Sequence, residues 1–238
     1  MKKNLFELMR VRSWMLAIAL LPALSSCLNS NDAPDPSTPA SYASFYHGSP
    51  DAGGLDILLD GTKINSAALA YGNYTGYATF SPGVNKLRFT STGSSTGLVD
   101  ITPTFTEGRL YSIFIINTLS SLETLVVKDS SATLSSTGRA GVRLVHLSPD
   151  APAVNIYTSG TDGKLLFGNR EFKTATNFME IDANVYSLDI KTTDGTKLAT
   201  VENITFSTGR FYTLVVRGFA TPPTGNSNTL TLQSLVNQ

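Results

Sequence analysis

From residue 42 onward, the chain consists of short segments in which apolar and polar residues alternate. Turn-forming residues separate the segments, and the Asp-Gly pair at 60–61 is a strong hairpin signal. Alternation with a period of two is typical of β-strands, and no long window in this region shows helical spacing. The pattern predicts strands at residues 44–47, 55–59, 77–80, 85–90, 99–105, 110–117, 123–128, 142–147, 154–157, 164–167, 176–181, 186–192, 199–206, 211–217 and 229–235.

These segments form two repeats. A His-x-Ser-Pro-Asp-Ala stretch begins at His47 and returns at His146, 99 residues later. Later positions match at a spacing of 101, and a two-residue insertion within 159–164 explains the change. The matched pairs at that spacing are Tyr77 and Phe178, Leu87 and Leu188, Phe105 and Phe206, and Gly108-Arg109 and Gly209-Arg210. A constant offset over most of each repeat indicates a duplicated fold.

The composition between the repeats suggests where one domain ends and the next begins. Residues 130–140 are mostly small and polar, so we predict a linker there. The first repeat then spans 42–129 and the second spans 141–238. Strands at this interval, joined by turns, favour two β-sandwiches over a parallel sheet.

The first 26 residues have the composition of an export signal. Basic residues between positions 2 and 12 precede an apolar run at 14–24, which is too short to span a bilayer. The following Leu-Ser-Ser-Cys, ending at Cys27, resembles the lipobox of bacterial lipoproteins. That resemblance implies cleavage of a signal peptide at 1–26 and attachment of acyl chains, palmitate among them, to Cys27. An ordinary signal peptide with a chance cysteine is the alternative, but Cys27 is the chain's one cysteine and has no disulfide partner.

Several expectations about location follow from the N-terminal segment. Residues 27–41 are proline-rich and lack apolar periodicity, so we expect an extended tether from the lipid anchor to the first domain. In enteric bacteria, an acidic residue directly after the lipidated cysteine retains a lipoprotein in the inner membrane. This chain has Leu28 at that position, so the retention signal is absent. We therefore expect a cell-envelope protein anchored in the outer membrane, where the cell has one. Both the periplasmic and the surface face of that membrane stay open as its location. The formal charge of zero argues against nucleic acid as a partner.

The penultimate strand of each repeat, at 110–117 and 211–217, is apolar on both faces. This pattern predicts a strand well inside a sandwich. Tyr111 and Tyr212 each follow a Gly-Arg pair and one apolar residue. They resemble a tyrosine corner, in which the hydroxyl group bonds back to the preceding turn.

Together, the His-x-Ser-Pro-Asp-Ala stretch and the later Gly-Arg-x-Tyr, once per repeat, resemble the domain-of-unknown-function family 4397. The second copy fits well, while the first has Gly53-Gly54 where the second has Pro152-Ala153. The resemblance implies two tandem immunoglobulin-like or transthyretin-like β-sandwich domains in an exported bacterial protein. It implies no activity.

The repeated stretches hold the chain's two histidines and are the main candidates for chemistry. One interpretation is a metal or proton-transfer site in each repeat, and another is a Ser-His-Asp nucleophile. A zinc site needs three or four ligands, and three catalytic side chains within five residues of a turn would not line up in series. We therefore favour a structural clasp between the first two strands, formed by His47, Ser49, Pro50 and Asp51, and by His146, Ser148, Pro149 and Asp150.

Other candidate sites have weaker support. Asp56, Asp60 and Asp162 lack the spacing of a calcium loop. Tyrosines at 71, 74 and 77 could form a platform for a glycan, but we favour core and edge packing as the explanation for most of these aromatic residues. No Gly-x-Ser-x-Gly, phosphate loop or cysteine cluster occurs, so we expect no enzyme, cofactor or metal.

The expected function is non-catalytic binding or adhesion at the cell envelope, with a protein or glycan as ligand. Two alternatives stay open at this point. One is a structural subunit of an envelope protein complex, and the other is a hydrolase with an unrecognised site.

Overall fold

A computed structural model describes residues 39–129 and 133–237. The predicted signal peptide, Cys27 and the tether up to residue 38 lie outside the described residues, as do residues 130–132 of the predicted linker. Pro39–Gln238 forms one compact unit. Within the described part of the chain, we find no helix with the length and apolar character needed to cross a membrane.

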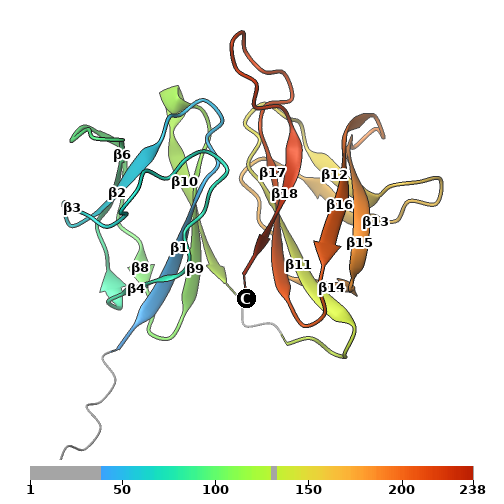
Figure 1. Ribbon diagram of the computed structural model, residues 1–238, viewed down its shortest axis with the longest axis horizontal. Helices are drawn as coiled ribbons and strands as arrows, with labels where there is room; N and C mark the ends of the chain where they lie inside the picture. Colours follow the sequence, from blue (N-terminus) through green and yellow to red (C-terminus); the bar gives the residue numbers. More distant parts are fainter. Residues whose placement is uncertain (1–38, 130–132, 238) are drawn as a thin grey trace, which may run out of the picture. The chain divides into compact units, whose positions relative to one another are not determined.

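The first repeat is a sandwich of two four-stranded sheets (Figure 1). One sheet has the order β10-β9-β1-β4, the other has the order β3-β2-β6-β7, and β5 pairs with β8. The elements are β1 (Ser41–His47), β2 (Leu55–Leu59), β3 (Thr62–Lys63), β4 (Ala78–Phe80), β5 (Gly83–Val84), β6 (Leu87–Ser91), β7 (Gly97–Ile101), β8 (Thr104–Phe105), β9 (Leu110–Ile116), the 3-10 helix η1 (Leu119–Ser121) and β10 (Glu123–Asp129).

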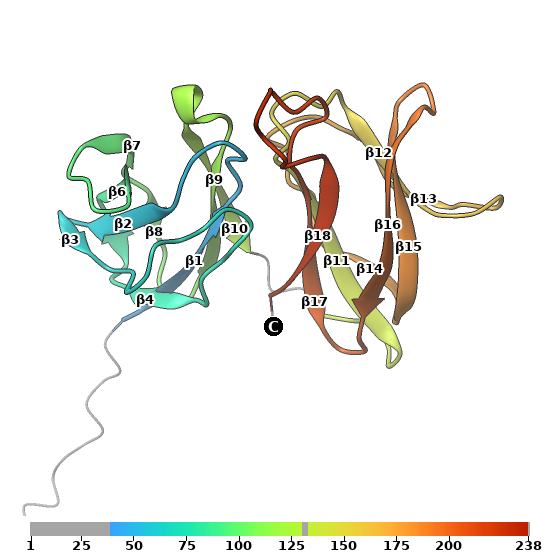
Figure 2. The same cartoon turned by 45° about the horizontal axis from the view of Figure 1, so that its top comes forward.

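The second repeat has the same architecture (Figure 2). Its sheets have the orders β14-β11-β17-β18 and β13-β12-β15-β16, which match those of the first repeat strand for strand. The elements are β11 (Arg139–His146), β12 (Val154–Thr158), β13 (Leu165–Arg170), β14 (Met179–Asp182), β15 (Asn184–Thr192), β16 (Lys197–Phe206), β17 (Phe211–Arg217) and β18 (Thr231–Val236). The expected all-β fold of two tandem sandwiches is confirmed.

One pairing in each repeat is not visible in the sequence pattern. Strand β1 lies parallel to β9, from Tyr42 opposite Leu110 to His47 opposite Ile115. Strand β11 lies parallel to β17 in the same way. Alternation shows which face of a strand is buried, but it does not show which strand lies beside it. The first and penultimate strands therefore form a parallel pair within otherwise antiparallel sheets.

The predicted Asp-Gly hairpin is confirmed between β2 and β3. Leu59 pairs with Thr62 across a two-residue turn. Asp60 and Gly61 both have positive φ, 48° and 83°. A type I′ turn requires this conformation at both central positions, and Asp and Gly accept it more readily than other residues do.

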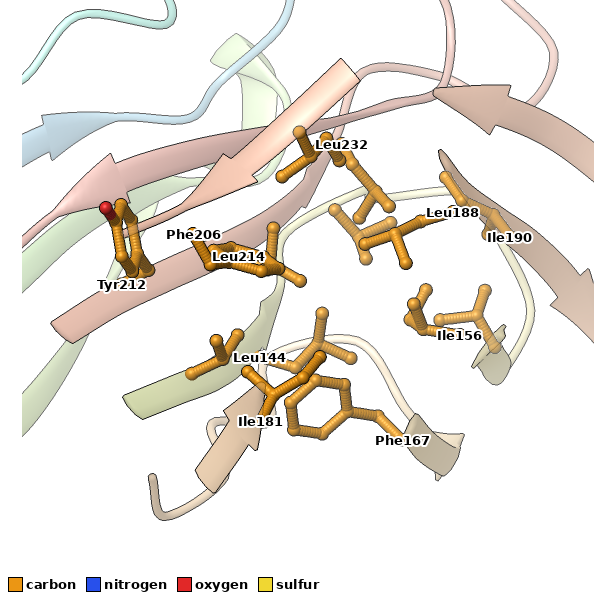
Figure 3. Packing of buried hydrophobic residues seen from close by; sticks show 14 of the residues in the cluster. Leu144, Ile156, Phe167, Ile181, Leu188, Ile190, Phe206, Tyr212, Leu214 and Leu232 are labelled. Atoms are coloured by element: carbon orange, nitrogen blue, oxygen red, sulfur yellow. The ribbon is translucent and has the colours of Figure 1, made fainter. Parts of the chain in front are cut away.

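Each sandwich closes over its own apolar core, and Figure 3 shows that of the second repeat. Tyr212, Leu214 and Val216 of β17 point into this core and are at most 5% exposed. Leu188 and Ile190 of β15 enter it from the facing sheet. Burying one such aliphatic side chain contributes about 1.5–3 kcal/mol, so the alternating positions predicted from the sequence account for much of the fold's stability.

The tyrosine corners are also confirmed. The hydroxyl of Tyr111 accepts a hydrogen bond from the backbone N–H of Thr106 at 3.0 Å, and that of Tyr212 accepts one from Ser207 at 2.9 Å. Gly108, in the first of these turns, has a φ of 67°, which explains the glycine of the Gly-Arg pair. The tyrosine therefore ties each penultimate strand to the turn that precedes it.

The outward faces of the penultimate strands are covered by the other repeat. The prediction of a strand well inside a sandwich holds for one face of each strand, while the other face packs against the second sandwich. Phe114 and Ile116 of β9 pack in one buried cluster with Val215 of β17. We call this cluster the seam, and its buried members are Tyr46, Phe114, Ile116, Val145, Leu147, Val215 and Leu235. The strands are apolar on both faces because one face fills a core and the other fills the seam.

Candidate functional site

The histidines of the two Ser-Pro-Asp stretches are fully buried and bonded to the backbone. The Nδ1 of His47 accepts the N–H of Ser49 at 3.3 Å, and its Nε2 lies 2.8 Å from the carbonyl oxygen of Gly53. In the second repeat, His146 makes the same contacts with Ser148 and Pro152, both at 3.3 Å. Because Nδ1 accepts, a neutral ring carrying its proton on Nε2 satisfies both bonds. Each imidazole thus connects the end of the first strand to the chain entering the second.

The aspartates of the two stretches hold a different part of each domain. Asp51 accepts the N–H of Leu119, in the loop after β9, at 2.7 Å. Asp150 accepts the N–H groups of Ala220 and Thr221, in the loop after β17, at 2.7 and 2.8 Å. These two loops begin at equivalent positions, and both Asn117 and Gly218 have positive φ.

The serine and proline positions complete the arrangement. The hydroxyl groups of Ser49 and Ser148 make only long contacts with the neighbouring aspartates, of 3.4 and 3.5 Å. The carbonyl oxygen of Pro50 accepts the side-chain amides of Asn226 and Asn228, from the long loop of the second repeat. We call each stretch, with its bonded loop, a clasp. The bonds between the aspartates and the loops have no signal in the sequence, because the loop groups that donate to Asp51 and Asp150 are backbone N–H groups.

The clasp surroundings favour neutral imidazoles. Burial lowers the pKa of His47 below its ordinary value of 6.5, and the bond to Gly53 offsets this only in part. The pKa of His146 is lowered by burial in the same way, against the opposing effect of its bond to Pro152. The rings of Tyr71 and Phe172 pack edge-on against the two imidazoles.

A family model for the domain of unknown function DUF4397 matches the chain twice, over residues 41–157 and 140–238. The chain belongs to the DUF4397 family. The clasp therefore occurs once in each of two DUF4397 domains, at the same place in the fold.

A solved structure is also similar to this chain. It is the tip fimbrial protein Mfa3 from Porphyromonas gingivalis, with a C-terminal truncation. The match has 10% identity and a TM-score of 0.22, and it covers 83% of this chain and 99% of the other. A TM-score of that size supports no statement about fold or function. Among curated proteins, none matches the chain.

The arrangement in the DUF4397 domains does not resemble a catalytic relay. The hydroxyl of Ser49 contacts Asp51, and both ring nitrogens of His47 are occupied by backbone groups, so the serine hydroxyl does not bond the imidazole. The described residues contain no group of three or more His, Cys, Asp or Glu side chains placed to hold a metal ion. Of the calcium candidates, Asp56 is buried and pairs with Lys63 at 2.7 Å, while Asp60 and Asp162 are exposed.

A polar network missed in the sequence crosses the seam. The guanidinium of Arg143 is buried and bonds Asp129 at 2.5 Å, and it also donates to Ser112 and Thr213. The hydroxyl group of Tyr77 donates to the other oxygen of Asp129 at 2.6 Å. Arg143 is a charged residue between the apolar Val142 and Leu144 in the middle of β11, which is the signal that could have revealed it. The network joins residues of both DUF4397 domains.

Acidification from pH 7 to 5 is expected to lower the melting temperature of the protein. In this range both histidines become protonated in the unfolded chain, whereas burial keeps them neutral in the folded chain. The free energy of unfolding therefore falls as pH falls. The contribution of the two neutral histidines to the free energy of unfolding is complete above pH 6.5. It is lost as pH falls from 6.5 toward the lowered pKa values of His47 and His146. The loss is at most about 1.4 kcal/mol per pH unit for each histidine. Thermal unfolding followed by circular dichroism at several pH values measures it.

Two controls isolate the histidines as the cause. The double substitution His47→Gln with His146→Gln should flatten the pH dependence between 7 and 5, where carboxyl groups with ordinary values near 3.8 contribute little. NMR titration of the imidazole protons in the unaltered protein gives an independent measurement that needs no variant. Imidazoles that titrate at or above pH 6.5 would contradict the prediction.

Proposed function

We propose that the chain is a lipid-anchored protein of the cell envelope that acts as a non-catalytic binding or adhesion module. The observation that carries this proposal is the direction of β1. The strand begins at Ser41, beside the predicted tether, and ends at His47, in the clasp. A protein anchored through Cys27 would enter its first domain at the end opposite the clasp. The clasp end would therefore be the one presented to partners.

The loops at the clasp end have the properties of a contact surface. Residues 117–122 connect β9 to β10, and the longer segment 218–230 connects β17 to β18. Neither segment contains a charged residue, and Leu119 in the first is 43% exposed. The aspartates of the clasps bond both loops to the segments that follow β1 and β11. Loops positioned by a rigid scaffold are where binding residues commonly occur.

An adherence experiment tests this proposal. Cells carrying the intact lipoprotein and cells lacking it are compared on surfaces coated with glycans or matrix proteins. Thr224→Asp places a charge on the long loop at the clasp end, whereas Thr208→Asp places one on an exposed turn at the opposite end. We expect adherence that depends on the lipoprotein and falls severalfold with Thr224→Asp, but is unchanged with Thr208→Asp.

Two results would contradict the binding proposal. Equal adherence by cells with and without the lipoprotein would remove its basis. If the cells do not adhere but one envelope protein co-purifies with the lipoprotein in fixed stoichiometry, the result would support a structural subunit of an envelope complex instead.

The anchor is tested by Cys27→Ser. This change should abolish incorporation of a labelled fatty acid, because the serine hydroxyl is not a substrate for attachment of diacylglycerol to a lipobox cysteine. Ser30→Ala, three residues later, serves as the matched control and should leave labelling intact. Continued labelling of the Cys27→Ser protein would exclude this cysteine as the anchor.

A further inference from the structure

A pocket of about 270 Å³ opens beside the seam, lined by residues of both DUF4397 domains. Tyr46, Phe114 and Leu235 of the seam contribute apolar surface to it. Tyr74 and Val236 also line it, and each is 46% exposed. The pocket extends along the seam from Val236, which pairs with Tyr212 at the start of β17, to Tyr46, the residue before the clasp histidine His47.

Tyr74 is an aromatic residue that the fold does not require. It forms an isolated bridge with Tyr46 in the first domain, and the equivalent bridge in the second domain joins Val145 to Ala175. Alanine therefore serves the same backbone position in the second domain. The first domain instead carries a half-exposed aromatic ring at the pocket.

The polar groups around the pocket are neutral hydrogen-bonding groups. They include hydroxyl groups of Ser112, Thr213 and Tyr77 and the amide of Asn237, and none of the lining residues carries a formal charge. Several bond one another, as Thr213 does with Asn237 at 2.7 Å. Each of the three hydroxyl groups donates one bond and accepts one within the network around Arg143 and Asp129, which leaves each oxygen one lone pair to accept from a ligand. The lining therefore suits a neutral molecule with several hydroxyl groups and one apolar face.

We propose that this pocket binds one neutral pyranose residue of a glycan, with a face of the sugar ring stacked on Tyr74. The volume is slightly below the range of about 300–1,000 Å³ for pockets that hold drug-sized ligands, so it fits one ring rather than a chain of them. The C–H face of a pyranose matches an aromatic ring, and its hydroxyl groups match the amide and hydroxyl groups opposite. This inference rests on the proposed function only in treating the chain as a binding protein.

Saturation-transfer NMR on the full-length protein tests the proposal. The protein is kept in a detergent without a sugar headgroup, and the probes are the methyl pyranosides of glucose, galactose, mannose and N-acetylglucosamine. We expect at least one of these to bind with a dissociation constant no weaker than the millimolar range. Tyr74→Ala, which copies Ala175, should weaken that binding about tenfold, equivalent to about 1.4 kcal/mol. Tyr74→Phe should retain it, because the ring is kept.

Tyr42→Ala is the matched control, because Tyr42 is an exposed tyrosine of the same domain outside the pocket. It should bind the sugar like the unaltered protein, and all variants should keep their melting temperature to within a few degrees. Absence of binding by every pyranoside, or equal binding by Tyr74→Ala, would overturn the pocket as a sugar site. If adherence still depended on the lipoprotein in that case, the proposed binding function would stand without the sugar site.

Discussion

Arg143→Met is expected to lower the free energy of unfolding by about 3–5 kcal/mol, because it leaves a buried carboxylate without its cation. The side chains of Arg143 and Asp129 are 2% and 7% exposed, and their atoms are 2.5 Å apart. Tyr77 and Ser112 would still donate to the carboxylate of Asp129, but neither neutral group balances its charge. Urea denaturation at pH 7 measures the loss.

Two further variants separate burial of charge from loss of a contact. Arg139→Met removes ion pairs with Asp182 and Glu180, whose side chains are 78% and 28% exposed, and should cost no more than about 1 kcal/mol. The double change Arg143→Met with Asp129→Asn removes both buried charges and keeps an acceptor for Tyr77 and Ser112, so it should recover most of the stability. Equal losses for Arg143→Met and Arg139→Met would contradict this account of the seam.

Phe114→Ala is expected to cost about 3–5 kcal/mol and to uncouple the two domains. The ring is 1% exposed and packs 5.8 Å from that of Tyr46, between centroids, inside the seam. Its removal leaves a cavity between the domains rather than within one of them. Differential scanning calorimetry should show one cooperative transition for the unaltered protein and two overlapping transitions for the variant.

Phe89→Ala provides a comparison of the same residue type and burial. Phe89 is 0% exposed but lies in the core of the first domain. Its loss should destabilise that domain directly and leave the seam contacts in place. Val126→Ala, at a position 39% exposed, should change stability by less than about 0.5 kcal/mol. A single unshifted transition for Phe114→Ala would show that the seam contributes little to folding.

The sequence allowed the strands and cores to be predicted, because alternation reports burial directly. Tyr212, Leu214 and Val216 entered the core where their spacing placed them. The offset of 101 residues likewise anticipated that Tyr111 and Tyr212 make the same bond to the preceding turn.

What could not be predicted depends on contacts between distant segments. The apolar residue at 114 indicated burial, but its neighbour, the second domain, could be known only from the fold. Asp51 and Asp150 indicated turns, but the loops that they bond offer only backbone N–H groups, which every sequence has. The partner of Arg143 was hidden for a similar reason, since Asp129 ends a half-exposed strand and carries no distinctive pattern.

The seam also limits how many domains such a chain can stack in this way. Phe114 of β9 and Val215 of β17 occupy equivalent positions, so each domain offers the same face to the other and the contact is pseudo-isologous. An association of like faces closes at two members, whereas head-to-tail contacts can extend a row indefinitely. A third copy joined to this chain would find both such faces occupied, and a domain separated from its neighbour would have a free face able to pair with a second molecule.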